Sequence, residues 1–453
     1  MQIIIVGCGA VGTTIIDQLS KEDHNITVID LDAESLKDVV DSYDVMGIVG
    51  NGASYTTMKE AGIEEADLMI AVTQDDELNL LSCLIAKKAG NCNTIARVRN
   101  PVYKQEVGYI KEELGLSMVI NPEEAAAQEA VRLLKFPSAR KVETFARSRV
   151  EMVTIQIEEG SILTGKTLQQ LQKELKSQVL FCVVSRGSEV IIPDGSFVPQ
   201  VHDEITLIGR SKHMISLFRK MKLPTSRVHS TIIIGGGSVS FYLIEQLIAL
   251  GVDVRVFEKN KERCKELSNI LPEALFINAS GTDRDMLMEE GLADAESFVA
   301  LTNIDEENIM LSLFAKSMSK AKRIIMLHHA RYGDLVDTLD VGSIIDTREI
   351  TAEKIVQFVR GVSNSLDSNI EALYAINEGK AEVLEFLIRE GAPVLDIPLA
   401  EMDLKKGVLI AVVLRGNEVV HPRGDTTIHV GDRVIVVTTI SGMGDIRDIL
   451  NKR

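Results

Sequence analysis

Short runs of β-branched and other apolar residues alternate with amphipathic stretches along the first part of the chain. The runs are Ile3 to Val6, Ile26 to Ile29, Met46 to Val49, Leu68 to Val72, Thr94 to Val98 and Met118 to Ile120. Near-continuous apolar strands separated by helices are typical of a parallel sheet that is covered on both faces. Six such strands predict one complete doubly wound α/β unit of the Rossmann type.

The pattern changes after the sixth run. Asn121 suits a helix N-cap and Pro122 the first helical position, and the helical pattern continues to Lys135, just before Pro137. Beyond this helix, apolar strands are joined by turn signals such as SRGSEV at 185–190. These signals predict hairpins in a small α+β domain.

The whole order of patterns then occurs a second time. IIVGCGAV at 4–11 matches IIIGGGSV at 232–239, and VVSRGSEVIIPDG at 183–195 matches VVLRGNEVVHPRG at 412–424. The separation between Thr73 and Thr302 equals that between Tyr103 and Tyr332. REITAEKIVQFVRG at 348–361 is the second copy of the helix that follows the sixth strand. Landmarks at nearly one offset indicate a tandem duplication.

We therefore expect four domains along the chain. They are a Rossmann-like domain at 1–121 with its helix to about 137, a small α+β domain at 142–225, a second Rossmann-like domain at 230–347 with its helix to about 364, and a second small α+β domain at 367–450. Each half is long enough to carry its own core. Residues 223–230 are the expected linker between the halves.

A glycine-rich turn follows the first strand of the first half. Its residues are Gly7, Cys8, Gly9, Ala10, Val11 and Gly12. In this GxGxxG pattern the first glycine permits a tight turn, the second lets a pyrophosphate approach the backbone, and the third lets the helix pack on the strand. The helix N-terminus offers free N–H groups to the anion. A turn needed only for packing is the alternative.

Asp30 ends the second strand, beyond the helix that begins at the glycine turn. A carboxylate at this place can accept hydrogen bonds from both hydroxyls of an adenosine ribose. The combination of strand, turn, helix and acid therefore predicts a nucleotide site. NAD, ATP and ADP share adenosine and a diphosphate, so the motif leaves the choice among them open.

Polar residues that follow the other strands of the first half are further candidates. Asn51 follows the third strand, near the expected place of the adenine, and Thr73 and Gln74 follow the fourth. Arg97 interrupts the apolar fifth strand, where a charge is costly unless it is paired with an anion. Arg97 either contacts a phosphate or forms a structural salt bridge. The acids at 75–77 are expected to stabilise a helix N-terminus.

The second half keeps part of this site. Its turn reads Gly235, Gly236, Gly237, Ser238 and Val239, but Ser240 replaces the third glycine. Glu258 ends the second strand in place of Asp30, and Met326 replaces Arg97. These differences predict a second nucleotide site with a different affinity or ligand. The neighbouring pair His328 and His329 is expected to be structural rather than a metal site.

Composition narrows the classes of function. The net charge is 49 − 66 = −17, which disfavours binding to nucleic acid or to an anionic membrane surface. No apolar window reaches the length of a spanning helix. The five cysteines are scattered without a CxxC pair, which predicts free thiols in the cytosol and no zinc site. No catalytic constellation accompanies the glycine turns, which favours a nucleotide sensor over an NAD-dependent oxidoreductase or a nucleotide-dependent adaptor.

Several segments together resemble a known family. IIIVGCGAVG at 3–12, the acid Asp30, GNGAS at 50–54, TQDDELN at 73–79 and the downstream α+β domain resemble the RCK/KTN regulators of potassium transport. The duplicated order is similar to that of the cytosolic regulatory subunits of Trk potassium uptake systems. The resemblance covers essentially the whole chain.

This resemblance implies a regulator that catalyses nothing. It implies binding of NAD(H) and, in some members, of ATP or ADP. It also implies a homo-oligomeric ring, with a tetramer as the expected size, which lies at the inner face of the cell membrane under a TrkH-like potassium-conducting subunit and gates it. The helix from Asn121 to Lys135 resembles the crossover helix that joins paired N-terminal units.

By position, the resemblance also implies the contacts of each nucleotide. The first would be held by Gly7, Cys8, Gly9, Ala10, Val11, Asp30, Asn51, Thr73, Gln74 and Arg97. The second would be held by Gly235, Gly236, Gly237, Ser238, Val239 and Glu258. No catalytic and no metal-binding residue is expected.

Overall fold

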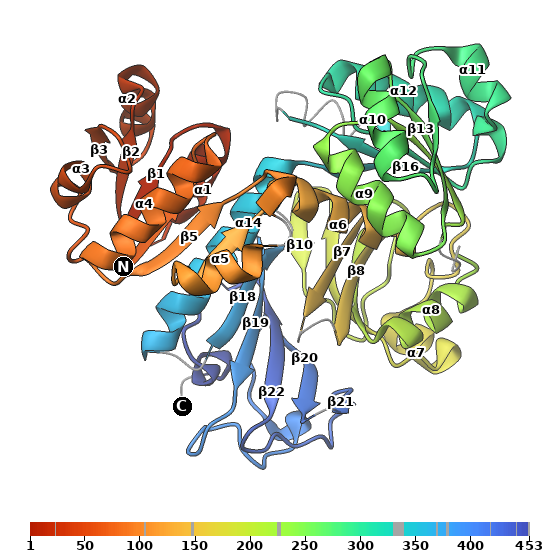
Figure 1. Cartoon of the computed structure of the whole chain (residues 1–453). Coiled ribbons are helices and arrows are strands. Elements are labelled where there is room, and N and C mark those ends of the chain that lie inside the picture. Colours follow the sequence, from red (N-terminus) through yellow and green to blue (C-terminus); the bar gives the residue numbers. More distant parts are fainter. Residues whose placement is uncertain are drawn as a thin grey trace. The chain divides into compact units, whose positions relative to one another are not determined.

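Two parallel and two antiparallel sheets make up the part of the chain that can be described (Figure 1). The computed structural model describes residues 1–22, 24–103, 106–145, 149–223, 228–328, 339–367, 370–376, 380–416, 418–440 and 442–451. The parallel sheets belong to the Rossmann-like parts and the antiparallel sheets to the smaller parts that follow them. The fold class predicted from the sequence is confirmed.

The first parallel sheet has the strand order β3-β2-β1-β4-β5-β6. Its strands are β1 (Gln2–Val6), β2 (Asn25–Asp30), β3 (Met46–Val49), β4 (Leu68–Ala71), β5 (Asn93–Arg97) and β6 (Met118–Ile120). Each end lies within one residue of the prediction, because continuous apolar runs define buried strands sharply. The order reverses beside β1, so the crevice at the carboxyl ends of β1 and β4 is the expected ligand position.

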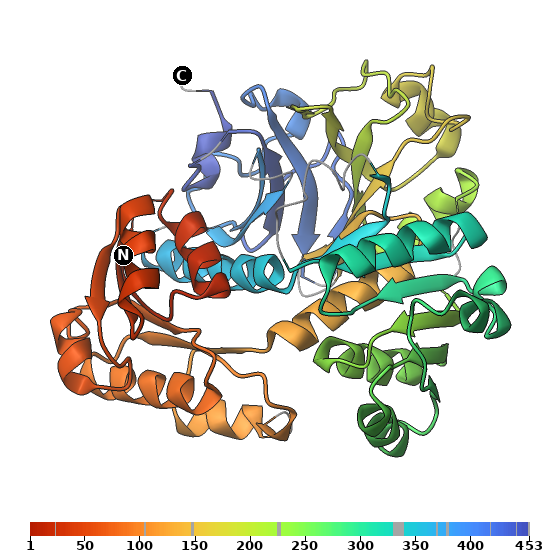
Figure 2. The same ribbon diagram turned by 90° about the horizontal axis from the view of Figure 1, so that it is seen from above.

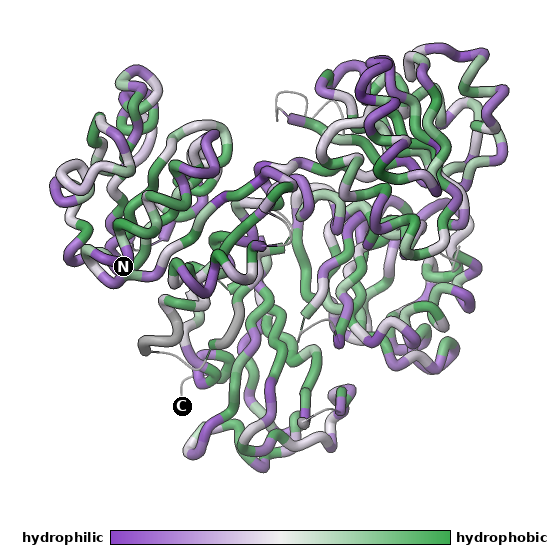
Figure 3. Tube along the Cα trace, viewed as in Figure 1, coloured by the Kyte–Doolittle hydropathy of each residue, from purple (hydrophilic) through white to green (hydrophobic). Residues whose placement is uncertain are grey.

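Helices cover both faces of this sheet. They are α1 (Ala10–Leu19), α2 (Ala33–Ser42), α3 (Tyr55–Glu60), α4 (Asp76–Ala89) and α5 (Val107–Glu113), and a 3₁₀ turn spans Pro101–Tyr103. Ile3 and Ile5 of β1 pack in one core cluster with α1 and α2, whereas Ile4 packs in the other with α3 and α4. Hydrophobic residues accordingly follow the strands in Figure 3.

One helix of the second half packs in the core of the first half. After β6, α6 (Pro122–Lys135) begins as predicted, with the Glu124 N–H donating to Asn121 Oδ1 at 2.9 Å. Its counterpart α14 (Thr347–Asp367) starts one residue before the predicted segment at 348–361 and ends about three residues beyond the predicted helix end at about 364. Ala352, Ile355, Val356 and Val359 of α14 belong to the core cluster of the first sheet, beside α1 (Figure 2). A helix of the second half therefore completes the core of the first.

The second parallel sheet repeats the first, in the order β14-β13-β12-β15-β16-β17. Its strands are β12 (Ser230–Ile234), β13 (Asp253–Phe257), β14 (Leu275–Ile277), β15 (Ser297–Ala300), β16 (Lys322–Met326) and β17 (Ser343–Ile345). The helices are α9 (Ser238–Ala249), α10 (Lys261–Ile270), α11 (Arg284–Glu289) and α12 (Asp305–Met318), with a 3₁₀ turn at Leu292–Asp294. Tyr332 and His329 lie outside the described residues.

The antiparallel sheets have the orders β10-β9-β11-β8-β7 and β18-β19-β22-β20-β21. The first contains β7 (Lys141–Phe145), β8 (Val150–Gln156), β9 (Leu180–Arg186), β10 (Glu189–Ile191) and β11 (Glu204–Gly209). The second contains β18 (Ile370–Ile376), β19 (Ala381–Leu387), β20 (Val408–Arg415), β21 (Glu418–Val420) and β22 (Arg433–Thr438). The predicted hairpin at Gly187 joins β9 to β10, and Gly187 has the positive φ of 59° that such a turn requires.

The two antiparallel parts differ in their helices. The first carries α7 (Leu168–Leu175) and α8 (Ser211–Lys220). Within its described residues, the second carries only 3₁₀ turns, at Leu399–Glu401 and Ile446–Ile449, beside its strands. Strands of both sheets share one core cluster, which includes Phe145 and Val437.

Contacts divide the chain into two compact units. One holds Met1–Val131 with His229–Val359, and the other holds Arg132–Val228 with Arg360–Arg453. Each unit therefore combines equivalent parts of both halves. The boundaries of four consecutive domains stay a prediction, as does the linker at 223–230, of which 224–227 lie outside the described residues.

Candidate functional site

The glycine turn of the first half links β1 to α1 with the tight geometry that the motif predicts. Gly7 has a φ of +103°, and its N–H donates to Ile29 O at 2.9 Å. A Cβ on Gly12 would lie 2.0 Å from Gly7 O, so only glycine lets α1 pack this closely on the turn. Gly9 is exposed at the N-cap of α1 with nothing within 4 Å of a Cβ position. The open space above Gly9 faces the helix N-terminus, where an anion is stabilised.

Asp30 is joined to this turn by its side chain. Asp30 Oδ2 accepts from the Cys8 N–H at 2.7 Å, and Oδ1 accepts from the Asp32 N–H at 2.9 Å. Each carboxylate oxygen keeps a further lone pair for a hydroxyl donor. Burial, followed by the hydrogen bond and charge of Asp30, raises the pKa of the Cys8 thiol to about 12. Cys8 therefore stays protonated, and its backbone rather than its sulfur is available to a ligand.

Thr73 lies against the glycine turn, as the sequence predicts for residues at the ends of β1 and β4. A Cβ on Gly7 would be 3.0 Å from the Thr73 nitrogen. The N–H and the hydroxyl of Thr73 both donate to Asn79 Oδ1, at 2.9 and 2.7 Å. Asn79 Nδ2 in turn donates to Arg97 O at 2.9 Å, so Asn79 ties Thr73 to β5.

Sequence reasoning missed Asn79, although the duplication carried the signal. Asn79 and Asn308 close the equivalent segments TQDDELN and TNIDEEN of the two halves. Asn308 repeats the whole network: it accepts from the Thr302 N–H at 3.0 Å and donates to Met326 O at 2.8 Å.

Arg97 is a buried cation without a counter-ion in salt-bridge contact among the described residues. Its side chain is 7% exposed, and its Nε has no hydrogen-bond partner. Burial lowers the pKa of the guanidinium, and the charge of Arg99 lowers it further, while Glu123 and Asp76 oppose this effect from a distance. The alternative of a structural salt bridge is thus not realised in the described part. A buried guanidinium without a counter-ion fits an anionic ligand.

Two carboxylates near Arg97 also hold unpartnered atoms. In the described part of the chain, Asp76 Oδ1 and Glu123 Oε2 are buried without a hydrogen-bond partner, and burial raises the pKa of Glu123. Asp76 Oδ2, by contrast, accepts from the N–H groups of Arg99 and Asn100, at 2.9 and 2.8 Å. Asp76 therefore fixes the segment after β5, a role beyond the helix-end stabilisation expected for the acids at 75–77.

The remaining predicted residues lie around the turn with different exposure. Ala10 is exposed in the first turn of α1, whereas Val11 is only 8% exposed and offers a ligand its backbone alone. Asn51 Oδ1 accepts from the Ala53 N–H at 2.8 Å. Gln74 is exposed, and its carbonyl accepts from Arg99 Nη2 at 2.8 Å.

Two further residues lie where the adenosine is expected: Leu31, which sequence reasoning missed, and Gly52, which belongs to the predicted adenine segment. Leu31 follows Asp30 and is 66% exposed, an apolar surface suited to the face of a base. Gly52 lies so close to β1 that a Cβ would be 2.1 Å from Val6 Cγ1. The signals available were an apolar residue directly after the acid and a glycine in the predicted adenine segment.

The second half repeats the glycine turn and its acid. Gly235 has a φ of +98°, and Gly237 is the exposed N-cap of α9, followed by the exposed Ser238. Glu258 Oε2 accepts from the Gly236 N–H and Oε1 from the Asn260 N–H, both at 2.6 Å. The longer acid thus makes the same pair of contacts as Asp30.

The second turn differs in its surroundings. Ser240, in place of the third glycine, is fully buried, and no described residue is a hydrogen-bond partner of its hydroxyl; Val239 is also buried. Met326 offers no charge, but Arg263 of α10 donates from Nε to Gly236 O at 2.9 Å. By the offset of the two glycine turns, Arg263 corresponds to Ser35, so a cation that the first site lacks lies beside the second turn.

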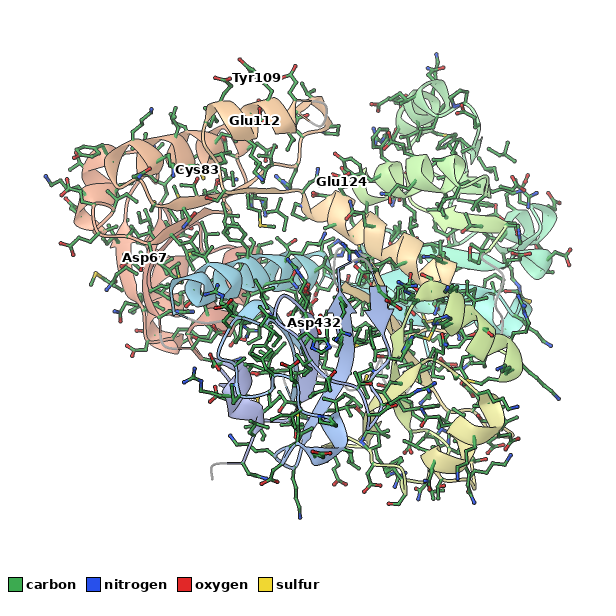
Figure 4. All side chains as sticks on the ribbon, turned by 90° about the horizontal axis from the view of Figure 1, so that it is seen from below. Asp67, Cys83, Tyr109, Glu112, Glu124 and Asp432 are labelled. Atoms are coloured by element: carbon green, nitrogen blue, oxygen red, sulfur yellow. The ribbon has the colours of Figure 1, made fainter. Side chains whose placement is uncertain are left out.

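Neither metal nor thiol chemistry is indicated by the described residues. Within them, no group of three His, Cys, Asp or Glu side chains is arranged to hold a metal ion. His328 Nδ1 lies 3.0 Å from Asp305 Oδ1, to which it donates in the tautomer protonated at Nδ1, while His329 is not among the described residues. All five cysteines are free and buried, including Cys83 of α4 (Figure 4), whose thiol donates a hydrogen bond to Ile95 O at 3.4 Å. No helix in this part of the chain is both long and apolar enough to cross a membrane.

Comparison with protein families decides the relationship. The TrkA-N domain matches residues 3–122 and 231–346, and the TrkA-C domain matches residues 152–222 and 383–451. The chain belongs to the TrkA family. Both domains are matched twice, so the predicted duplicated RCK architecture is confirmed.

Two full-length relatives agree with membership of the TrkA family. The chain is 33% identical over 454 residues to "Trk system potassium uptake protein TrkA homolog 1" of Methanosarcina mazei, covering 98% of this chain and 99% of that protein. It is 31% identical to "Trk system potassium uptake protein TrkA" of Halomonas elongata, covering 96% of this chain and 95% of that protein. The chain is thus a regulatory protein of the Trk potassium uptake type, and neither relative is named as an enzyme.

Solved structures show the same fold. The chain matches the "GsuK RCK domain" with a TM-score of 0.62 at 15% identity, over 96% of this chain and 92% of that one. It matches the "GsuK channel bound to NAD" with the same TM-score and identity, over 96% and 76%. At this identity the likeness concerns the fold alone.

Proposed function

We propose that this TrkA-family chain is the nucleotide-sensing, gating subunit of a Trk-type potassium uptake system. It binds NAD(H), and ATP or ADP, at the two glycine turns and controls a TrkH-like membrane potassium-conducting subunit. One observation carries the proposal: Asp30 and Glu258 each accept a hydrogen bond from the glycine turn beside them, at 2.7 and 2.6 Å. Two equivalent turns joined to an acid are what two adenosine diphosphate groups require.

The residues fit such a ligand. The space at Gly9 leaves room for a diphosphate, and the buried Arg97 lacks the anion that a phosphate would supply. The first nucleotide would be held by the ten residues predicted above, together with Leu31 and Gly52 on the adenosine side. The second would be held by the six predicted residues and Arg263. A bound nucleotide supplies charge and shape here rather than a reaction.

The proposed partner and assembly follow the family. We infer a homo-oligomeric ring, a tetramer of this duplicated chain, that reaches the inner face of the cell membrane through its potassium-conducting partner. The net charge of −17 supports a protein partner rather than nucleic acid. Gating requires only that a nucleotide bind one arrangement of the ring better than another. The nucleotide can then shift the equilibrium between the two arrangements by no more than its difference in affinity for them.

Calorimetry tests the binding step. NADH, NAD, ATP and ADP are titrated into the wild-type chain, Asp30→Ala and Glu258→Ala, with Asp38→Ala on the exposed face of α2 as the matched control. We expect each acid variant to lose about tenfold or more in nucleotide affinity at its own site, because two charge-assisted hydrogen bonds from the ribose hydroxyls to the carboxylate are removed. Absence of any adenine-nucleotide binding to the wild-type chain would refute the proposal.

Potassium flux tests the gating step. The chain is added to proteoliposomes that hold the potassium-conducting partner, and flux is measured with and without each nucleotide. We expect a nucleotide-dependent flux that Asp30→Ala alters and Asp38→Ala does not. A flux that responds to nucleotide equally in wild type and Asp30→Ala contradicts the assignment of the first site.

A further inference from the structure

We propose that Tyr242, a residue of the second half, is a positioning residue of the first nucleotide site and couples it to the second. The inference rests on the proposed nucleotide binding and deepens it. It concerns a hydrogen-bonded junction between the two Rossmann-like parts, both of which belong to one compact unit.

Tyr242 reaches from α9 to the segment that follows β5. Its side chain is fully buried, and its hydroxyl accepts from Asn121 Nδ2 at 3.0 Å and lies 3.5 Å from Arg99 O. Asn121 Nδ2 also faces Arg99 O, at 3.4 Å. A buried hydroxyl between two polar groups is costly to leave unsatisfied, so this junction holds the three residues together.

The segment held by Tyr242 belongs to the first site. Arg99 lies just beyond Arg97 on the same segment, and its Nη2 donates to the carbonyl of Gln74. The Arg99 N–H also donates to Asp76 Oδ2. Gln74 and Arg97 are both predicted contacts of the first nucleotide. The hydroxyl of Tyr242 acts on Gln74 through the backbone and then the side chain of Arg99, and on Arg97 through the chain segment that Arg97 shares with Arg99. Tyr242 itself need not touch the nucleotide.

The other end of Tyr242 belongs to the second site. α9 begins with Ser238, directly after the N-cap Gly237, and Tyr242 follows one turn later. Phe241 packs edge-on against its ring, with centroids 5.4 Å apart. The N–H groups at the start of α9 are the expected contacts of the second diphosphate. Because a helix moves as a rigid element, a shift of α9 on binding is transmitted to the tyrosine hydroxyl.

The equivalent position in the first half makes no such junction. By the offset of the two glycine turns, Tyr242 corresponds to Thr14. The Thr14 hydroxyl bonds to Ala10 O of its own helix at 2.9 Å. Thr14 instead lines an open groove of about 380 Å³ that Arg348 and Glu349 of α14 also line. The side-chain junction therefore joins the start of α9 to the first site at one of two pseudo-equivalent places.

A double-mutant cycle measures the coupling. The dissociation constant of NADH at the first site, identified as the binding lost in Asp30→Ala, is determined in wild type, Glu258→Ala, Tyr242→Phe and the double variant. We expect Glu258→Ala to change this constant about fivefold in the wild-type background, the lower range of allosteric coupling, and to leave it nearly unchanged in the Tyr242→Phe background. A purely structural tyrosine would leave the effect of Glu258→Ala the same in both backgrounds.

Two further variants guard against a simple folding defect. Asn121→Ser keeps an oxygen that caps α6 but removes the amide that bonds to Tyr242, so we expect the same loss of coupling. Tyr374→Phe, which removes a hydroxyl from the other compact unit, is the matched control and should leave the coupling intact.

The outcomes separate this inference from the proposed function. An equal effect of Glu258→Ala with and without the Tyr242 hydroxyl overturns the inference, as does a first site that ignores Glu258→Ala in wild type. Absence of any NADH binding to the wild-type chain refutes the proposed function instead.

Discussion

At the scale of single residues, the first site depends on atoms that nearly touch. The third glycine of the motif is required because α1 starts against the carbonyl of the first: a Cβ on Gly12 would lie 2.0 Å from Gly7 O. In the second half, Ser240 carries a Cβ at this position, and its buried hydroxyl lacks a partner. The two turns therefore hold their helices under different constraints, although both acids bond to their turns in the same way.

Gly12→Ala should accordingly separate α1 from its turn. We expect a loss of stability of about 1–3 kcal/mol, from overpacking against the backbone, and weaker nucleotide binding at the first site. Thermal unfolding and calorimetry measure both effects. Gly108→Ala is the control, because nothing lies within 4 Å of a Cβ at this exposed helical glycine. Equal melting temperatures and affinities for the two variants would contradict the close approach.

A pair of histidines predicts a pH dependence of stability. The rings of His213 and His421 lie 5.4 Å apart, and His213 Nδ1 and His421 Nε2 are buried without a hydrogen-bond partner among the described residues. Burial, followed by the charges of His213, Arg210 and Arg423, lowers the pKa of His421 from 6.5 to about 4. Burial and the charges of Lys212 and Arg210 also lower the pKa of His213.

The direction in which the free energy of unfolding changes with pH follows from proton linkage. Between pH 6.5 and about 4 the unfolded chain binds a proton at residue 421 that the folded chain does not, so the free energy of unfolding falls as the pH falls through this window. We expect His421→Gln to flatten this dependence in urea titrations between pH 7 and 4. His229→Gln, at a histidine that is 61% exposed, is the control. An unchanged slope in His421→Gln would show that other groups govern it.

At the scale of elements, local sequence patterns determine which strands and helices form but not which elements pack against them. The strands of the first sheet match the prediction because each is a continuous apolar run bounded by polar residues. The start of α6 matches because Asn121 and Pro122 signal it within two positions. The helical pattern at 348–361 shows that α14 has an apolar face, yet nothing local indicates that this face packs beside α1. Helix periodicity specifies a buried stripe and leaves its partner open.

The packing of α14 in the core of the first sheet gives a direct prediction. Ile355 of α14 is fully buried in the core of the first sheet. We expect Ile355→Ala to lower the free energy of unfolding by about 2–4 kcal/mol, the range for a large-to-small core substitution. Hydrogen exchange should rise in β1 and α1, although the substitution lies in the other half of the chain.

Met310→Ala is the matched control for this substitution, because Met310 is 65% exposed on α12. Its effect should stay within about 0.5 kcal/mol. Faster exchange confined to the second half in Ile355→Ala would argue against the packing of α14 on the first sheet.

At the scale of the whole molecule, the sequence predicts the glycine turns and their acids but not the contacts between segments far apart in the chain. Gly7, Asp30 and their counterparts are local in sequence and keep their roles, so the two glycine turns were predictable. The environment of Arg97 and the bond from Asn121 to Tyr242 depend on segments far apart in the sequence, which no single-chain pattern specifies. The duplication indicated two equivalent halves, but not that each compact unit takes one part from each half.

The duplication itself suggests how the molecule would behave if divided. The face of α14 that enters the first core contains Ala352, Ile355 and Val359. Counted from the ends of β6 and β17, the corresponding residues of α6 are Ala127, Ala130 and Leu134. These three residues of α6 are also buried. Without the second half, the sheet face beside α1 would lose α14, and the apolar face of α6 offers a substitute for it. This arrangement favours self-association in which α6 of one copy packs on the other.

We therefore expect residues 1–228, expressed alone, to form a homodimer in which α6 of each copy takes the place of α14 on the other. Light scattering coupled to gel filtration measures the mass, and unfolding should depend on protein concentration, as it does for an obligate dimer. Ala127→Glu, which places a charge in the exchanged face, should abolish the dimer. A stable monomer with concentration-independent unfolding would mean that the first half closes its own core, and that the packing of α14 on the first sheet is a consequence of the linkage rather than a need of the first half.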